Sequence, residues 1–279
     1  MSKWADGRNG INDIKAQLEG LNVRPNPALG QNFLCDDSAI ELISRAASYD
    51  GQHELMEIGP GLGALTGALI GLVPRVTAVE IDANMVRALK ARFSGEAGLD
   101  IIQSDILKLD IPSVMPGTFI AAGNLPYYIT TPIVTRLLCL SSSIPCMTFM
   151  VQKEAARRFF AAPKTKLYGP LSIMAQYYYD IQSLLSLSPA SYYPQPDVDS
   201  EVVRLIRRDM TAKLEPKRFF GFIEALFAMR RKTIYNNLKP ILGSRDAICD
   251  ALSSAGIAEN ARAEELSIDK LAQLAALCI

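Results

Sequence analysis

Short apolar runs alternate with helical patterns over the first two thirds of the chain. Four of the first five runs show little apolar–polar alternation, as expected for strands covered on both faces. The predicted strands are Glu54–Ile58, Val76–Ile81, Asp100–Gln103, Thr118–Gly123 and Cys146–Val151, and the predicted helices between them are Ala64–Leu72, Ala83–Phe93 and Pro132–Leu140. The repeated strand–helix–strand order implies a parallel sheet with helices on both faces, a doubly wound α/β fold.

The pattern changes character near residue 208. Before it come predicted helices at Lys153–Ala161 and Pro170–Tyr178 and predicted strands at Ile181–Leu187 and Glu201–Ile206, giving a sheet of about seven strands. After it the pattern is helical only, at Pro216–Met229, Arg245–Ser254 and Ser267–Leu277. We therefore expect an α/β domain over residues 1–208 and a small all-helical domain over residues 209–279.

Composition narrows the class of protein. The 279 residues are 49% apolar and 21% charged, as in soluble globular domains. No stretch is apolar for long enough to span a bilayer, and the N-terminal region lacks the apolar core of a signal peptide. Five scattered cysteines without a CxxC pair fit reduced thiols, so we expect a cytoplasmic protein. With His53 as the single histidine, a multi-histidine metal site is impossible, and we expect no metal.

A glycine-rich junction follows the first predicted strand. In EIGPGLGALT, Gly59 and Gly61 would let a ligand approach backbone N–H groups at the positive end of a helix. Glu80 ends the next strand, 21 residues after Gly59, where a carboxylate can accept hydrogen bonds from both ribose hydroxyls. Asp105 follows the third strand and could accept from an adenine amino group, or could only cap a turn. NAD and S-adenosylmethionine both fit these residues, and a glycine turn that only eases packing is the alternative.

The loop GNLPYYIT after the fourth strand favours S-adenosylmethionine over NAD. It has no role in hydride transfer but suits an adenine extruded from RNA. The side-chain oxygen of Asn124 and the carbonyl of Leu125 could accept both N–H bonds of the adenine amine. Pro126 would fix the loop, and Tyr127 would offer a stacking face. The sequence therefore predicts methyl transfer to adenine that depends on alignment, with no general base required beforehand.

From about Asp13 to the C-terminus, the chain resembles the ribosomal RNA adenine dimethyltransferases, the bacterial small-subunit dimethyladenosine transferases. Besides EIGPGLG, EID and NLPY, the motifs that carry the resemblance are LGQNFL, MVQKEAARRF, YGPLSIMAQYY, YYPQPDVDSEVVRL and RRKTIYNNL. The resemblance implies a Rossmann-like class I methyltransferase fold with S-adenosyl-L-methionine as cofactor. It also implies N6,N6-dimethylation of two adjacent adenines in the 3′-terminal hairpin loop of 16S ribosomal RNA, in small-subunit biogenesis.

The resemblance further implies roles for single residues. Asn32 and Leu34 would contact the methionine end of the cofactor, Gly59 the part near its sulfur, Glu80 its ribose, Asp105 its adenine, and Asn124 the methyl acceptor and the cofactor edge. Tyr127 would stack on one side of the target base. Tyr192, which stands where the family usually has Phe, would stack on the other side.

Charge is segregated although Lys plus Arg and Asp plus Glu both total 29. Residues 153–166 hold five basic and one acidic residue, and residues 213–239 hold seven basic and two acidic residues. We expect an RNA phosphate surface formed by Arg157, Arg158, Arg230, Arg231 and Lys232. A solvated helix face is the alternative for these residues.

The expected partner is small-subunit ribosomal RNA, offered within a partly assembled 30S subunit to a monomeric protein that binds no membrane. Three other functions stay open. They are methylation of adenine in large-subunit ribosomal RNA, a non-catalytic assembly factor that keeps the fold, and a nicotinamide-dependent oxidoreductase.

Overall fold

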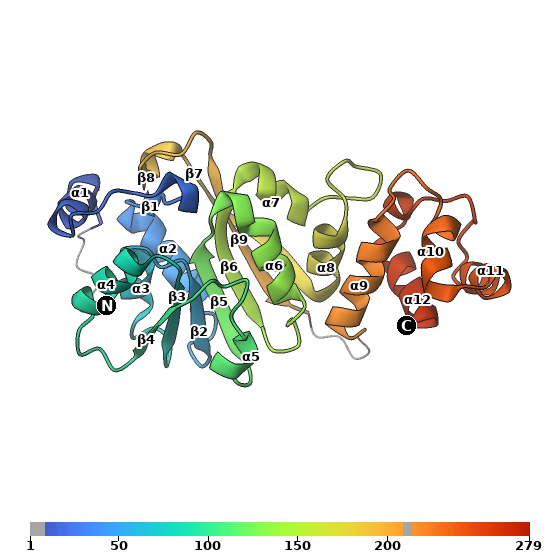
Figure 1. Cartoon of the computed structure of the whole chain (residues 1–279), viewed down its shortest axis with the longest axis horizontal. Coiled ribbons are helices and arrows are strands. Elements are labelled where there is room, and N and C mark those ends of the chain that lie inside the picture. Colours follow the sequence, from blue (N-terminus) through green and yellow to red (C-terminus); the bar gives the residue numbers. More distant parts are fainter. Residues whose placement is uncertain (1–8, 209–213) are drawn as a thin grey trace. The chain divides into compact units, whose positions relative to one another are not determined.

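The computed structural model describes residues 9–208 and 214–279 (Figure 1). The strands are β1 (Phe33–Leu34), β2 (Glu54–Ile58), β3 (Val76–Glu80), β4 (Leu99–Gln103), β5 (Phe119–Asn124), β6 (Cys146–Gln152), β7 (Tyr179–Leu187), β8 (Tyr192–Tyr193) and β9 (Ser200–Arg207). The helices are α1 (Ile11–Gly20), α2 (Asp37–Ala47), α3 (Ala64–Leu69), α4 (Ala83–Arg92), α5 (Ile111–Val114), α6 (Thr130–Leu138), α7 (Lys153–Phe159), α8 (Pro170–Tyr178), α9 (Pro216–Phe227), α10 (Ile234–Leu242), α11 (Arg245–Ser254) and α12 (Ile268–Cys278). Short 3-10 helices are η1 (Pro27–Leu29), η2 (Tyr127–Ile129), η3 (Pro189–Ser191) and η4 (Ala263–Glu265).

Seven strands form one sheet in the order β4-β3-β2-β5-β6-β9-β7, which confirms the predicted α/β fold. Each of its strands lies within two residues of a predicted one. The pairs β2–β3, β3–β4, β2–β5 and β5–β6 are parallel, whereas β9 runs antiparallel to β6. No long helix separates β7 from β9 in the chain, and parallel neighbours need such a crossover. The sheet is therefore mixed at this edge rather than parallel throughout.

The order of the strands creates a switch point between β2 and β5. From β2 the chain proceeds outward through β3 and β4, and then returns to place β5 on the other side of β2. Glu57 lies opposite Ala122 in this pair, so the ends of both strands open onto the same edge. Open α/β sheets bind ligands in the crevice at such a point.

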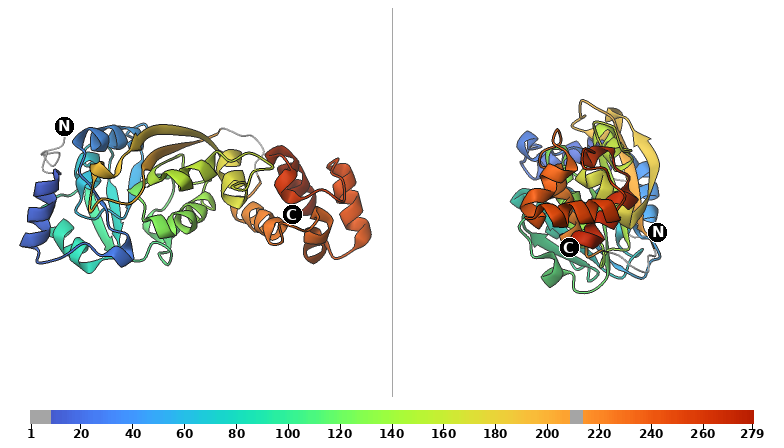
Figure 2. Two further views of the ribbon diagram at one scale, coloured as in Figure 1. Left: turned by 90° about the horizontal axis from the view of Figure 1, so that it is seen from above. Right: turned by 90° about the vertical axis from the view of Figure 1, so that its right-hand side faces the viewer.

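Helix α2 covers one face of the sheet (Figure 1 and Figure 2). Asp36 caps it, since its carboxylate accepts the backbone N–H of Ala39 at 3.0 Å. The apolar positions Ile40, Ile43 and Ala47 follow at helical spacing and pack into a core that also contains side chains of β2, β3, β5, β6 and β9.

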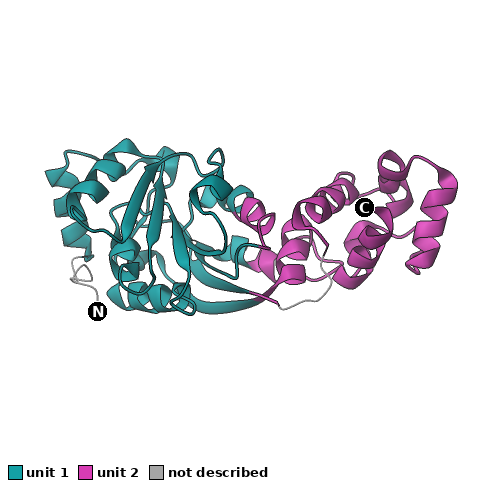
Figure 3. Cartoon of the chain, turned by 90° about the horizontal axis from the view of Figure 1, so that it is seen from below, with its two compact units in different colours: residues 1–133, 143–156, 181–206 teal, residues 134–142, 157–180, 207–279 magenta. Residues whose placement is uncertain are grey.

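The chain divides into two compact units (Figure 3). The first contains residues 1–133, 143–156 and 181–206, and the second contains residues 134–142, 157–180 and 207–279. In the second unit, the buried hydroxyl of Tyr168 donates to the carbonyl of Leu266 at 2.9 Å, and that of Tyr178 donates to the carbonyl of Leu214 at 2.8 Å. These bonds tie residues 157–180 to the C-terminal helices. The predicted domain boundary near residue 208 stays a prediction.

Candidate active site

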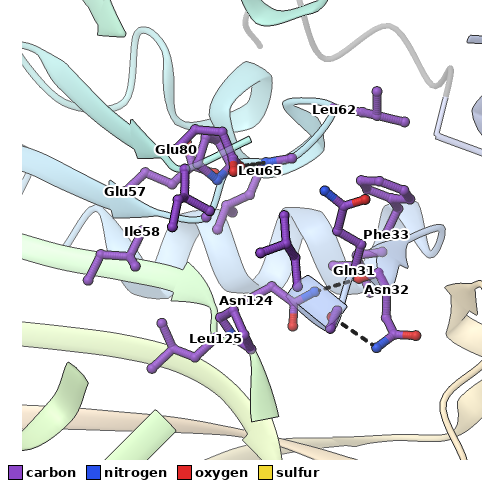
Figure 4. A pocket seen from close by; sticks show the side chains of 18 of the residues that line it. Gln31, Asn32, Phe33, Glu57, Ile58, Leu62, Leu65, Glu80, Asn124 and Leu125 are labelled. Carbon is purple, nitrogen blue, oxygen red and sulfur yellow. Dashed lines mark hydrogen bonds between the residues drawn. The ribbon is translucent and has the colours of Figure 1, made fainter. Parts of the chain in front are cut away.

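A pocket opens at the switch point, where the ends of β2, β3 and β5 meet the segment before α2 (Figure 4). The loop Asn124–Tyr127, predicted to bind the methyl-accepting adenine, is called the acceptor loop. This loop and all the predicted cofactor residues line the pocket: Asn32, Leu34, Gly59, Gly61, Glu80, Asp105, Asn124, Leu125, Pro126 and Tyr127. The structure thus brings together residues that lie up to 95 positions apart. Among the predicted catalytic residues, Tyr192 does not line the pocket.

Glu80 presents a carboxylate that the backbone holds in place. It is 6% exposed and accepts hydrogen bonds from the N–H of Gly61 at 3.1 Å and of Asp82 at 2.9 Å. Burial raises the pKa of this carboxyl, and the two N–H groups oppose that rise. Gly61 has φ +57°, and a Cβ there would lie 3.0 Å from the Phe33 ring. A side chain at position 61 would therefore be strained by the positive φ and would press on the Phe33 ring.

Glu57 is a second buried carboxylate, which the sequence did not single out. It is 1% exposed, and the hydroxyl of Thr66 donates to it at 2.6 Å. Burial, with a smaller contribution from the negative charge of Glu80, raises the pKa of Glu57 to about 7. Sequence reasoning predicts a strand here, but it does not reveal that an acid at the strand end is shut off from water.

We expect the buried Glu57 to make stability fall as the pH rises. The folded chain holds this proton up to about pH 7, whereas the unfolded chain releases it near pH 4.5, so stability is lost across that interval. Above pH 7 the loss is about 3 kcal/mol. Glu57→Gln should remove this loss of stability. Urea unfolding at pH 5 and pH 8 measures how the free energy of unfolding changes with pH in the wild type and in E57Q. Glu54→Gln, at the exposed start of the same strand, is the matched control, and an unchanged slope in E57Q would refute the assignment.

Asn124 is oriented by the segment before α2. Its Nδ2 donates to the carbonyl of Asn32 at 2.8 Å, which leaves its Oδ1 as the group available to accept (Figure 4). The next residue, Leu125, is held by its own N–H, which donates to the carbonyl of Met150 in β6 at 3.0 Å. The carbonyl of Pro126 accepts the hydroxyl of Thr130 at 3.0 Å. The acceptor loop is therefore fixed at consecutive positions.

Gln31 fastens the segment that carries Asn32. Its Nε2 donates to the carboxylate of Asp82 at 2.8 Å, and its Oε1 accepts the N–H of Asn26 at 2.8 Å. Asp82 also caps α4 through the N–H of Asn84. The motif LGQNFL marks this segment in the sequence, but the bond from Gln31 to Asp82 joins residues 51 positions apart, and no local pattern reports it.

Asp105 caps a turn and also lines the pocket. Its Oδ1 accepts the N–H of Leu107 at 2.9 Å, which is the turn cap, and the residue borders the space where a ligand would lie. Lys108 lies 3.9 Å from its other oxygen. A contact from Asp105 to an adenine stays a prediction.

The aromatic residues predicted to sandwich a base lie in different environments. Tyr127 is half-buried at the pocket, and its Oη lies 2.7 Å from the Oγ of Ser200. Tyr192 is completely buried, and its hydroxyl has no hydrogen-bond partner among the residues that the structure describes. Burial raises the pKa of the Tyr192 hydroxyl. One stacking face therefore borders the pocket in this structure, and the second remains inside the core.

Because a buried hydroxyl without a partner destabilises a fold, Tyr192→Phe should raise the free energy of unfolding by about 1 kcal/mol. Chemical denaturation measures the change. Tyr178→Phe is the matched control, because the Tyr178 hydroxyl donates to the carbonyl of Leu214, and its loss should destabilise the chain instead. Equal destabilisation of Y192F and Y178F would show that the Tyr192 hydroxyl is satisfied.

The predicted phosphate-binding residues all belong to the second unit, and all are exposed. Arg230 is already engaged, since its Nε donates to Glu264 at 2.9 Å and its Nη1 to the carbonyl of Lys166 at 3.0 Å. Within residues 9–208 and 214–279, nothing pairs with the side chains of Arg231 and Lys232. Lys213, which belongs to the same basic segment, lies outside the described residues.

Neither a metal centre nor a membrane-spanning helix is found among the described residues. No cluster of three or more His, Cys, Asp or Glu side chains there could hold a metal ion. None of the helices there is long and apolar enough to cross a membrane.

Comparison with known proteins agrees with the geometry. Residues 22–279 match the model of the family described as ribosomal RNA adenine dimethylase. Ribosomal RNA small subunit methyltransferase A of Acidobacterium capsulatum is 37% identical over 262 residues, which cover 92% of this chain and 93% of the relative. A dimethyladenosine transferase from Plasmodium falciparum has the same fold, with TM-score 0.72 and 24% identity over 86% of this chain and 95% of that one. The 23S rRNA methyltransferase ErmE gives TM-score 0.64 and 26% identity over 88% and 99%. The chain therefore belongs to the ribosomal RNA adenine dimethylase family, as its motifs predict.

Proposed function

We propose that this protein uses S-adenosylmethionine to dimethylate the N6 atoms of two adjacent adenines in the 3′-terminal hairpin loop of small-subunit ribosomal RNA. The observation that carries the proposal is the fixed loop Asn124–Tyr127, which borders the same pocket as Glu80. The near full-length similarity to ribosomal RNA small subunit methyltransferase A supports the choice of RNA. The proposal includes a monomer that acts in the cytoplasm on a partly assembled 30S subunit, without a metal.

The residues that line the pocket fit S-adenosylmethionine in their chemistry. The Glu80 carboxylate is fixed by two N–H groups and keeps further lone pairs for a ribose diol. Gly59 has φ +67° and lies beside the carbonyl of Asn124, so its backbone borders the pocket without a side chain. Asn32 and Leu34 line the remaining wall. When bound, the cofactor supplies a methyl group already activated by a sulfonium centre.

The acceptor loop would place the target adenine so that its amine faces the methyl group. Oδ1 of Asn124 would accept one N–H of the adenine amine, and the carbonyl of Leu125 would accept the other. Two acceptors on one amine favour a pyramidal nitrogen whose lone pair faces the donor. Tyr127 would stack on the base and hold its plane. Holding the reacting atoms about 3 to 3.5 Å apart would favour the transfer without a prior general base, since the amine can lose its proton after the methyl group has moved.

Methyl transfer to isolated subunits tests the proposal. The purified protein and deuterated S-adenosylmethionine are incubated with 30S and 50S subunits from cells whose small-subunit RNA lacks these methyl groups. Mass spectrometry of nucleosides should then find labelled N6,N6-dimethyladenosine in the small-subunit RNA. Label in 50S RNA alone would favour the large-subunit alternative. Cofactor binding without any transfer would favour a non-catalytic assembly factor.

Neutralising Arg231 and Lys232 together should weaken RNA binding and reduce its dependence on salt. Removing one cation from a phosphate lowers the slope of log affinity against log salt by about 0.7 to 0.9, so a decrease of about 1.5 is expected for the pair. Fluorescence anisotropy at several salt concentrations measures it. Arg245→Gln, at an exposed position of α11, is the control. The surface is misassigned if the double variant keeps the wild-type slope or loses cofactor affinity.

A further inference from the structure

Ser200 is a buried hydroxyl with one partner at the pocket. It is the first residue of β9 and is 0% exposed, so its hydroxyl finds its partners inside the protein. Its Oγ lies 2.7 Å from the Oη of Tyr127, across 73 positions of sequence. Tyr127 is half-buried, and its ring could turn toward solvent if this bond were absent.

Strand β6 explains how the two residues meet. Asn124 at the end of β5 lies opposite Met150, and Ser200 at the start of β9 lies opposite Gln152 on the other side of β6. The loop that leaves β5 is tied at its beginning by the N–H of Leu125 on the carbonyl of Met150. The hydroxyl of Tyr127 ties the loop again, this time to β9. Both ties are anchored in paired strands, so the ring between them has little freedom.

The Ser200 hydroxyl lies near the hydroxyls of both Tyr127 and Tyr192. The hydroxyl of Tyr192 is also buried and has no hydrogen-bond partner within the described part of the chain. Ser200 and Tyr127 both influence the pKa of the Tyr192 hydroxyl, so all three hydroxyls share one neighbourhood. Ser200 therefore lies near both tyrosine hydroxyls, and its 2.7 Å contact is with Tyr127, the residue that borders the pocket.

We propose that Ser200 is a positioning residue of the methyl-accepting pocket and fixes the Tyr127 ring through its hydroxyl. A fixed ring sets the plane of the entering adenine and thereby aims its amine at Asn124 and Leu125. Ser200 does not touch substrate or cofactor, and it acts through Tyr127 alone. This inference rests on the proposed function and adds a residue to it.

A double-mutant cycle with Ser200→Ala and Tyr127→Phe tests the inference, because either change removes the same hydrogen bond and keeps the aromatic ring. Each single variant should lower the single-turnover methylation rate about 3- to 10-fold, the range for one neutral hydrogen bond. The double variant should be no slower than the slower single variant. Ser200→Thr, which keeps the hydroxyl, should restore the rate. Cofactor affinity, measured by calorimetry, should not change.

A spectroscopic signal separates positioning from a general loss of structure. An RNA hairpin with 2-aminopurine at the target adenine should lose fluorescence when the base stacks on Tyr127, and Ser200→Ala should weaken that quenching. Ser183→Ala is the matched control, since its exposed hydroxyl donates to Glu201 in the same region of the sheet. S183A should quench and methylate like the wild type.

Two results would overturn the inference. One is a wild-type rate and full quenching in S200A. The other is a double variant whose loss is the product of the two single losses, because independent effects exclude a shared bond. A wild-type protein that methylates no adenine is a different result, since it rejects the proposed function and, with it, the role given to Ser200.

Discussion

Asn124→Ala should reduce the single-turnover rate of methyl transfer by roughly 10²- to 10³-fold, the size of effect seen when one preorganised polar group is removed from a transition state. The variant lacks the Oδ1 that would accept an adenine N–H. It also lacks the Nδ2 that donates to the carbonyl of Asn32, so part of the pocket wall is released. The rate is measured at saturating cofactor and RNA, which removes any contribution from weaker binding.

Two further measurements assign the loss to the acceptor. Calorimetry of N124A should show cofactor binding weakened by less than about 10-fold, because one hydrogen bond of the pocket is removed while Glu80 is retained. Asn124→Asp keeps the Oδ1 acceptor but loses the Nδ2 donor to Asn32, so a slow N124D would show that this bond is needed to aim the acceptor. A rate close to that of the wild type in N124A would remove Asn124 from the mechanism.

Gly123→Ala should be the most destabilising small substitution in the sheet. A Cβ at this position would lie 2.3 Å from the carbonyl oxygen of Ile58, which belongs to the backbone of β2 and cannot move aside like a side chain. Strands β2 and β5 would have to separate at the switch point. We expect a loss of at least about 3 kcal/mol, at the upper end of overpacking effects. Thermal and urea unfolding measure it.

A glycine-to-alanine change at a different position should stabilise the chain instead. Gly221 is an exposed residue of α9, and a Cβ there meets nothing within 4 Å. Gly221→Ala should therefore stabilise the chain by about 0.5 to 1 kcal/mol through helix propensity. If G123A were as stable as the wild type, the close approach of β2 and β5 would be wrong.

The features that can be predicted from sequence are those with a local cause. Buried parallel strands are nearly continuous apolar runs, so the parallel strands β2, β3, β5 and β6 are visible in the pattern. Because parallel strands end at one edge, the residues after them are expected to converge, as Glu80 and Asn124 do. Helices α1, α2, α5 and α10 are not among the predicted elements, although α2 carries both a cap and an apolar stripe.

The remaining features depend on interactions between distant residues. Strands β1 and β8 are two residues long, too short for any periodicity. The bonds from Gln31 to Asp82 and from Tyr127 to Ser200 join residues 51 and 73 positions apart. The raised pKa of Glu57 and the burial of Tyr192 follow from packing that only the folded chain defines.

The hydrogen bond between Asn32 and Asn124 also bears on how the protein is made. The carbonyl that orients the amide is synthesised 92 residues before the amide itself, and the strand that holds Leu125 comes later still. A nascent chain that has exposed only its first hundred residues carries the glycine loop and Glu80 but no acceptor loop. The pocket can therefore be completed only when the chain as far as strand β6 has left the translating ribosome.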